Sequence, residues 1–299
     1  GSTMREHPAR AANPPMMASR GPTAMILALL ALALSAWPAS AGQDSTPGRI
    51  VSLAPSITRE LSDLGAQDLL VGATTHCPLP AGTSVRIVGS PGRISIERVY
   101  ALKPDIVLAS TDCNSRADVA ALKGLGCAIH VFAGCETLAC MCTSFRELGD
   151  LLGRSDRADA IVKDVQARIR AIESGVRATH RPKVFWQVGA SPLVTASDAT
   201  FAGEFLRRAG AVNVFGDARM RYPRVNAEEV LRRDPDVIIV VSRMEPGSGS
   251  TLWERYPGMS AVRSGRVHEL SADLVCQPTP AMFLKALEAV VAAVHPGEP

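Results

Sequence analysis

The sequence is poor in aromatic residues and has no strong excess of charge of either sign. Phe, Trp and Tyr together make up 4% of the 299 residues, and the formal net charge at pH 7 is only +3. Base-stacking platforms need aromatic side chains, and binding to nucleic-acid phosphates or to an anionic membrane needs clustered positive charge. These shortages argue against nucleic acid as a partner and against a membrane-surface patch.

The N-terminal apolar segment is too short to be a membrane anchor. It runs from Met25 to Trp37, whereas a helix that spans a bilayer needs roughly 20 apolar residues. Arg20 precedes it and the small-residue segment 38–41 follows it, which is the order of parts in a cleaved secretory signal. We therefore interpret residues 1–41 as an expression scar and a signal peptide. Because Gly42 rather than cysteine follows, we expect a periplasmic protein without a lipid anchor.

Signatures of catalysis are also scarce. The sequence contains no Cys-x-x-Cys motif and no Gly-x-Ser-x-Gly motif. The first is typical of disulfide oxidoreductases, and the second places the nucleophile of many hydrolases. We therefore expect a binding protein rather than an enzyme, with a thiol-based redox enzyme as an alternative from a different class.

A repeated unit is the clearest positive signal. Residues 96–110 and 227–242 both begin with a short amphipathic helix that carries a glutamate in its first turn, Glu97 or Glu228. A Pro-Asp pair ends the helix, and an apolar β-branched run follows as a buried strand. Two copies of one helix-strand unit predict two α/β lobes, and a cleft between such lobes is where a small ligand is expected to bind.

The rest of the chain alternates strand and helix in the same way, which predicts mostly parallel sheets covered by helices. One long amphipathic helix interrupts this alternation, with Ser155 as its predicted N-cap. The resulting fold class is α/β, with two lobes that contain parallel-type sheets, are joined by one long helix and enclose a ligand cleft. We assign residues 48–154 to the N-terminal lobe, 155–179 to the linking helix and 182–299 to the C-terminal lobe.

Several motifs, in this order along the chain, resemble those of a known family. They are the two repeats together with segments 49–56, 75–78, 222–228 and 264–267, whose sequences are RIVSLAPS, THCP, YPRVNAE and SGRV. This pattern resembles the helix-linked periplasmic substrate-binding proteins of ABC importers. The cobalamin-binding branch is the most similar, and ferric-siderophore and haem binders are its relatives.

The resemblance implies a monomeric carrier that captures a metal-containing chelate, a corrinoid in the first instance, and delivers it to a membrane permease. In the family one exposed glutamate on each lobe docks onto permease arginines, and Glu97 and Glu228 occupy the matching positions. The alternative is that both glutamates only stabilise their helix dipoles. Tyr222 takes the place of one corrin-packing tryptophan of the cobalamin branch, whereas Ser110 stands where another aromatic residue is typical.

Seven cysteines are unusual in an exported protein. Four of them are expected at the ligand cleft: Cys77, Cys113 and Cys135 follow strands of the N-terminal lobe, and Cys276 lies in a loop of the C-terminal lobe. Four thiolates around one point would suit a soft metal or an iron-sulfur cluster. The same carrier role with a cysteine-ligated metal centre in place of a corrinoid is therefore the second hypothesis.

Two other fates of the cysteines remain open. An oxidising compartment favours disulfides, and one of Cys135, Cys140 and Cys142 could pair with Cys127 or with another cleft cysteine. Because seven is an odd number, at least one thiol of the monomer stays unpaired and could have no role.

Further ligand-binding candidates lie near the expected cleft. His76 stands beside Cys77 and could bind a metal, although a histidine in such a proline-containing loop is more often an ordinary polar residue. Trp186, Arg219 and Arg221 are candidates for the wall formed by the C-terminal lobe. Either arginine could pair with carboxylate or amide oxygens of a chelate, or could be a solvated loop charge.

Overall fold

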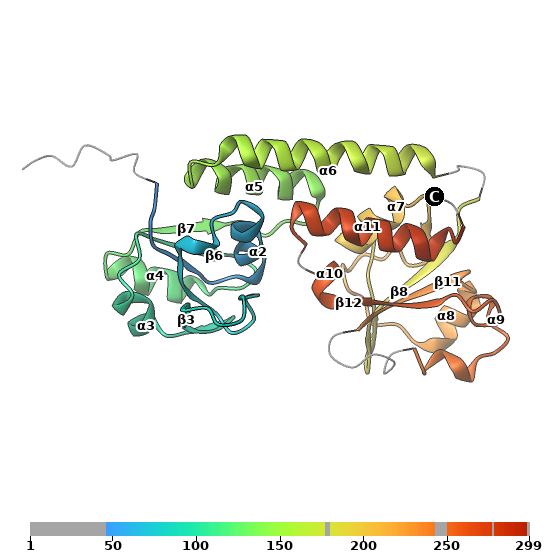
Figure 1. Cartoon of the computed structure of the whole chain (residues 1–299). Coiled ribbons are helices and arrows are strands. Elements are labelled where there is room, and N and C mark those ends of the chain that lie inside the picture. Colours follow the sequence, from blue (N-terminus) through green and yellow to red (C-terminus); the bar gives the residue numbers. More distant parts are fainter. Residues whose placement is uncertain (1–45, 177–179, 243–249, 277, 298–299) are drawn as a thin grey trace, which may run out of the picture. The chain divides into compact units, whose positions relative to one another are not determined.

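The computed structural model describes residues 46–176, 180–242, 250–276 and 278–297. Two mainly parallel β-sheets with covering helices form its framework, as the α/β prediction requires (Figure 1). The predicted signal peptide lies outside the described residues, as do positions 177–179 at the end of the predicted linking helix. Within the described ranges no helix is both long and apolar enough to cross a membrane.

The N-terminal sheet is parallel throughout, in the order β3-β2-β1-β6-β7. Its strands are β1 (Ile50–Ser52), β2 (Leu70–Ala73), β3 (Arg86–Ile87), β6 (Ile106–Ser110) and β7 (Ile129–Phe132). The antiparallel pair β4 (Gly89–Ser90) and β5 (Arg93–Ile94) accompanies it. The helical elements are α2 (Pro55–Asp63), η1 (Gln67–Leu69), α3 (Ile96–Ala101), α4 (Arg116–Gly124) and α5 (Leu138–Leu151). The central strand β1 is completely buried, as expected for a parallel sheet with covered faces.

The C-terminal sheet has the order β10-β8-β11-β12, with β9 added antiparallel to β8. Its strands are β8 (Lys183–Ala190), β9 (Leu193–Thr195), β10 (Val212–Asn213), β11 (Val237–Ser242) and β12 (Val267–Ser271). The helical elements are α7 (Phe201–Arg208), α8 (Ala227–Arg233), η2 (Trp253–Arg255), α9 (Ser260–Arg263), α10 (Ala272–Val275) and α11 (Pro280–Val294). Thr279 caps α11 by accepting the Met282 N–H, and Pro280 opens the helix.

The predicted linking helix is α6 (Ser155–Gly175), which packs against α5 and α11 (Figure 1). Its buried face consists of Ala158, Val162, Val165 and Ile169. The predicted N-cap was wrong: Arg154 is the capping residue, no side chain caps the helix, and Ser155 already belongs to it. The reason is that α5 ends in a tight turn in which the Arg154 N–H bonds to the Gly149 carbonyl, so the chain passes directly into α6.

The two repeat copies have the same geometry. Lys103 and Asp234, each directly before the repeat proline, both adopt left-handed backbone conformations, with φ of 47° and 42°. A left-handed residue at this place ends each helix directly before its proline. The aspartate after each proline then ties its strand to the first strand of its lobe. Asp105 accepts the Arg49 N–H at 2.8 Å, and Asp236 accepts the Lys183 N–H at 2.8 Å.

The hydrophobic core continues from one lobe into the other. Phe145 of α5, Phe205 of α7 and Phe283 of α11 are all completely buried in one cluster, which also contains residues of α6. The rings of Phe205 and Phe283 are 4.5 Å apart, and Trp186 stacks on Phe205 at 6.2 Å. Burial of each such ring stabilises the fold by roughly 1.5–3 kcal/mol, so this cluster holds the surrounding helices and strands in register.

Candidate functional site

A cleft of about 230 Å³ is lined by residues from both lobes. Its N-terminal wall carries three carboxyl groups, those of Glu60, Asp112 and Glu136, among serine, cysteine and apolar residues. Phe201, Tyr222, Cys276 and Pro278 form the opposite side. We call this space the acidic cleft, because among its described lining residues none is Lys, Arg or His.

A second cavity, of about 570 Å³, adjoins the acidic cleft and shares Phe201, Tyr222 and Cys276 with it. Its lining residues contain no charged side chain within the part of the chain that the structure describes. We call it the apolar pocket, and its remaining lining is Trp186, Val188, Gly189, Ser191, Pro192, Val194, Ala196, Ala202, Val241 and Val275. Volumes of this size fall in the range of small-molecule sites.

The carboxyl ends of the parallel strands build the N-terminal wall. Ser110 ends β6 and leads to Asp112 and Cys113, while β7 ends at Phe132 and leads to the 133–136 segment. Asn114 fastens the strand ends together: its side chain accepts the Ser110 N–H at 2.9 Å and donates to the Leu53 carbonyl at 3.1 Å. Residues at these strand ends converge on the cleft, as open α/β sheets require.

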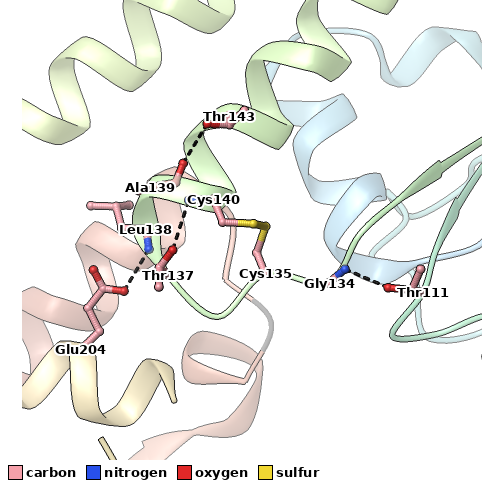
Figure 2. Close-up of a disulfide and its surroundings, with 9 residues drawn as sticks. All are labelled: Thr111, Gly134, Cys135, Thr137, Leu138, Ala139, Cys140, Thr143 and Glu204. Carbon is pink, nitrogen blue, oxygen red and sulfur yellow. Dashed lines mark hydrogen bonds between the residues drawn. A yellow bond between two sulfur atoms is a disulfide. The ribbon is translucent and has the colours of Figure 1, made fainter. Parts of the chain in front are cut away.

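Gly134 allows two parts of this wall to approach closely. Its N–H donates to Thr111 Oγ1 at 2.8 Å (Figure 2). A Cβ atom at position 134 would lie 2.0 Å from an oxygen of the Asp112 carboxylate, so a side chain there would displace the Asp112 carboxylate. Glycine at position 134 therefore leaves room for the Asp112 carboxylate against the backbone of the neighbouring strand end.

The segment after Gly134 is fixed by a disulfide and by helix capping (Figure 2). Cys135 is bonded to Cys140, and Thr137 between them caps α5 by accepting the Cys140 N–H at 3.2 Å. Glu204 of α7 accepts the Leu138 N–H at 2.9 Å from the other lobe. A buried carboxylate at a helix N-terminus is favourable, because it satisfies a free N–H and interacts with the helix dipole.

Glu60 has the most perturbed ionisation of the residues that line the cleft. It lies within α2 and its side chain is 7% exposed. Burial, reinforced by the neighbouring charge of Asp63, raises the pKa of Glu60 to about 8. Desolvation penalises the ionised form of a carboxyl group, so Glu60 is mostly protonated at neutral pH.

One ion pair connects the two sides of the cleft. Arg221 Nη1 lies 2.6 Å from Glu136 Oε1, and both side chains are partly exposed. Next to this pair, Tyr222 is 49% exposed and lines both cavities. Partial burial, and then the charges of Glu136 and Cys276, raise the pKa of Tyr222, so the phenol stays protonated at neutral pH.

Five of the residues selected from the sequence come together at these cavities. Cys113 and Cys135 line the acidic cleft, Trp186 lines the apolar pocket, and Tyr222 and Cys276 line both. Arg221 lies at the edge, paired with Glu136. Their role in ligand binding remains a prediction, but their common location is consistent with it.

Three other selected residues lie elsewhere. His76 and Arg219 are exposed and line neither cavity. Cys77 is 7% exposed and belongs to the hydrophobic core, with its sulfur 3.2 Å from Thr74 Oγ1. The Cys77 N–H bonds to the Thr74 carbonyl, and this turn directs the side chain back onto the sheet. We therefore leave Cys77 out of the proposed ligand contacts.

The four cysteines predicted to hold a metal do not meet as four thiolates. Cys77 is in the core, and the sulfur of Cys135 is bonded to Cys140. This pairing joins one of the three clustered cysteines, Cys140, to a cleft cysteine, Cys135, which is within the alternatives considered from the sequence. Among the described residues there is no group of three or more His, Cys, Asp or Glu side chains placed to hold a metal ion.

Sequence reasoning missed the acidic character of the cleft. Glu60, Asp112, Glu136 and Phe201 were not selected, although all four line it. A usable signal existed for Glu60 alone: in the helical pattern it lies on the same face as Ile57, Leu61 and Leu64, which are buried. Nothing local distinguishes Glu136 or Phe201 from ordinary loop and helix residues.

The predicted docking residues Glu97 and Glu228 are both exposed in the first turns of α3 and α8. Glu97 accepts a hydrogen bond from Ser95 Oγ at 3.0 Å. Hydrogen bonds from its own backbone N–H and from Ser95 lower the pKa of Glu97, so it is ionised at neutral pH. No ion pair engages Glu97 or Glu228 in the described part of the chain.

Comparison with known proteins identifies the family to which this fold belongs. The family model described as "Periplasmic binding protein" matches residues 50–274, so the chain belongs to the periplasmic binding protein family. The vitamin B12-binding protein of Pectobacterium carotovorum is 30% identical over 250 residues, which cover 79% of this chain and 90% of the relative.

Solved structures agree with this assignment. The periplasmic vitamin B12-binding protein of Vibrio cholerae superimposes with a TM-score of 0.71 at 26% identity, covering 83% of this chain and 97% of that one. A periplasmic haem-binding protein from Pseudomonas aeruginosa gives a TM-score of 0.74 at 26% identity, covering 85% and 94%. The chain is thus similar to carriers named for corrinoids and to carriers named for haem, and its own cleft must decide between them.

Proposed function

We propose that this chain is the periplasmic substrate-binding protein of an ABC importer, that it captures a corrinoid, and that it delivers this ligand to the permease. The vitamin B12-binding relatives and the shared fold support the proposal. The observation that carries the choice of ligand is the charge of the cleft. The acidic cleft and the apolar pocket have no basic lining residue among the described residues, and Arg221 at their edge pairs with Glu136.

The charge of the cleft favours a corrinoid over haem. Haem carries propionate carboxylates, which need cationic or hydrogen-bonding partners when they are desolvated. A cobalamin instead surrounds its corrin ring with neutral carboxamide side chains, and its single anionic group is the phosphodiester of the nucleotide loop, away from the ring. Carboxyl and hydroxyl groups on one wall and an apolar surface on the other suit a ring with such neutral side chains.

The direct test is a titration of the purified protein with cyanocobalamin and, separately, with haemin, followed by quenching of tryptophan fluorescence. We expect cyanocobalamin to bind with a Kd in the micromolar range or tighter and haemin to bind more weakly. Tighter binding of haemin, or no measurable binding of cyanocobalamin, would overturn the choice of ligand.

A second ligand class remains within the same role. Cys113 and Cys276 line one cleft from opposite lobes, and thiolates bind soft metals. Anaerobic reconstitution followed by metal and sulfide analysis separates this alternative, because a cluster would bring iron and acid-labile sulfide whereas a corrinoid brings cobalt. Two cleft cysteines are fewer than the four thiolates that usual clusters need.

Glu97 and Glu228 are our proposed contacts to the permease. Both are exposed carboxylates at equivalent positions of the two repeats. Close charge pairs at an interface have coupling energies of about 1.5–7 kcal/mol, so replacing both with alanine should abolish uptake in a reconstituted transporter. Ligand affinity should be unchanged, and the Glu229→Ala variant is the matched control because Glu229 is engaged with Arg232 and Arg233.

A further inference from the structure

Glu60 carries a buried carboxyl group that makes no evident contribution to the packing or hydrogen bonding of the described fold. Its side chain is 7% exposed, and it lines the acidic cleft together with Ser56 and Ile57 of the same helix. Within the described residues no hydrogen bond and no ion pair involves its carboxyl oxygens. A polar group this buried normally has a partner, because an unsatisfied one costs roughly 1–3 kcal/mol.

The surroundings of Glu60 contain negative rather than positive groups. Asp63, one turn further along α2, is the charged residue that raises the pKa of Glu60. Asp63 is itself occupied, because Thr279 Oγ1 donates to it at 3.1 Å and Lys285 and Arg157 lie near enough to act on its charge.

The other titratable groups on the cleft walls are also acids. They are Asp112 and Cys113 after β6, Glu136 before α5, and Tyr222 and Cys276 of the C-terminal lobe. In this setting the Glu60 carboxyl is stable only in its neutral form.

We propose that Glu60 acts as a neutral carboxylic acid that donates a hydrogen bond from the cleft wall to an uncharged oxygen acceptor of the bound ligand. This inference rests on the proposed function, since the carboxamide oxygens of a corrinoid supply such acceptors. The ligand completes the hydrogen bonding of a group that the protein itself leaves open. Glu60 is therefore a specificity-determining residue that selects for a carbonyl-type acceptor at this point of the cleft.

Two replacements of Glu60 separate donation from simple packing. In Glu60→Gln the amide N–H keeps a donor of the same length, whereas Glu60→Leu keeps the volume and removes the donor. Titrated with cyanocobalamin at about pH 7, Glu60→Gln should bind within about two-fold of wild type, and Glu60→Leu should bind about ten-fold or more weakly. Thermal unfolding of both variants verifies that they are folded.

The pH dependence adds a readout that a packing role would not produce. The proton of Glu60 is lost as the pH rises through about 8, so wild-type affinity should fall between about pH 6.5 and about pH 9.5. Glu60→Gln has no such proton and should show a flat profile. Asp164→Asn, an exposed substitution on α6, is the matched control and should follow wild type.

The possible results distinguish a failure of the proposed function from a failure of the inference about Glu60. If wild-type protein binds no cyanocobalamin, the proposed function fails and this inference fails with it. If wild type binds but Glu60→Leu binds equally well, the inference alone is overturned. A pH profile of Glu60→Gln that matches wild type also overturns it, because a cleft thiol or Tyr222 would then be the titrating group.

Discussion

The two walls of the ligand site differ in chemistry. The N-terminal wall presents Glu60, Asp112 and Glu136, and its shape comes from loops at the ends of β6 and β7. The wall of the apolar pocket comes from the C-terminal lobe and contains no charged side chain among its described residues. A ligand with one polar and one apolar face has a single favourable orientation between such walls, because the reverse orientation would desolvate its polar groups without partners.

The walls also differ in how they are supported. Trp186 of the apolar pocket is 2% exposed and continues into the aromatic cluster of Phe205 and Phe283. The N-terminal wall depends instead on polar contacts and on the Cys135–Cys140 disulfide. The apolar wall should therefore contribute mainly to folding, and the polar wall mainly to recognition. The predictions below test this division, from the largest expected effect to the smallest.

Trp186→Ala should cause the largest loss of stability. Removing a fully buried aromatic side chain lowers the free energy of unfolding by about 3–5 kcal/mol, and Trp186 also stacks on Phe205. Urea denaturation measures this change. Tyr222→Ala is the comparison within the same pocket: Tyr222 is half exposed, so it should affect cyanocobalamin affinity much more than stability. Equal losses of stability in the two variants would contradict the view that the buried part of the apolar wall, rather than its exposed edge at Tyr222, supports the fold.

Glu60→Gln should stabilise the protein in a pH-dependent way. Because the pKa of Glu60 is raised to about 8 in the folded state, the folded protein retains a proton that the unfolded chain loses near its ordinary pKa. Wild-type stability therefore declines as the pH rises from the unfolded pKa to about 8, and this decline is absent from Glu60→Gln. Above that range the variant should be more stable by about 5 kcal/mol, because each pKa unit corresponds to about 1.4 kcal/mol.

Urea denaturation of both proteins at several pH values tests this second prediction. The difference between wild type and Glu60→Gln should be close to zero at acidic pH, grow through neutral pH and then level off. Asp164→Asn is again the control for general charge effects. A difference that does not change with pH would mean that folding does not shift the pKa of Glu60, so its carboxylate would be ionised and well solvated or paired in the polar wall.

Loss of the disulfide should have a smaller effect, confined to the N-terminal wall. Cys135 and Cys140 are separated by 5 positions, so their bond closes a short loop. Chain-entropy arguments then give about 2 kcal/mol for its removal. The double variant Cys135→Ser/Cys140→Ser should unfold at correspondingly lower urea concentration, and wild type in a reducing agent should behave alike. No change in either experiment would show that capping by Thr137 and Glu204 is sufficient to hold the segment.

The sequence was a better guide to the apolar framework than to the polar wall. From the sequence alone, Pro280 and the apolar pattern after it predict a helix over 280–294, and α11 has these bounds because both signals are local. The two repeats can likewise be recognised from the short-range spacing of their glutamate, Pro-Asp pair and apolar run. Glu60 was missed although its place on the apolar face of the helix was a usable signal, because a single charge on an amphipathic helix is usually solvated. The backbone turn that directs Cys77 away from the cleft depends on its contacts with Thr74. Reasoning from strand ends alone does not include such contacts.

The Arg221–Glu136 pair should contribute least, although it bridges the two sides of the cleft. Both side chains are partly exposed, and exposed ion pairs are typically worth about 0.2–1 kcal/mol. A double-mutant cycle with Arg221→Ala and Glu136→Gln, measured by urea denaturation at low and high salt, gives the coupling energy directly. A value below about 1 kcal/mol that shrinks with salt fits a contact screened by solvent. A coupling well above this range would mean that the pair holds the two walls together, and the polar wall would then support the fold as well as recognise the ligand.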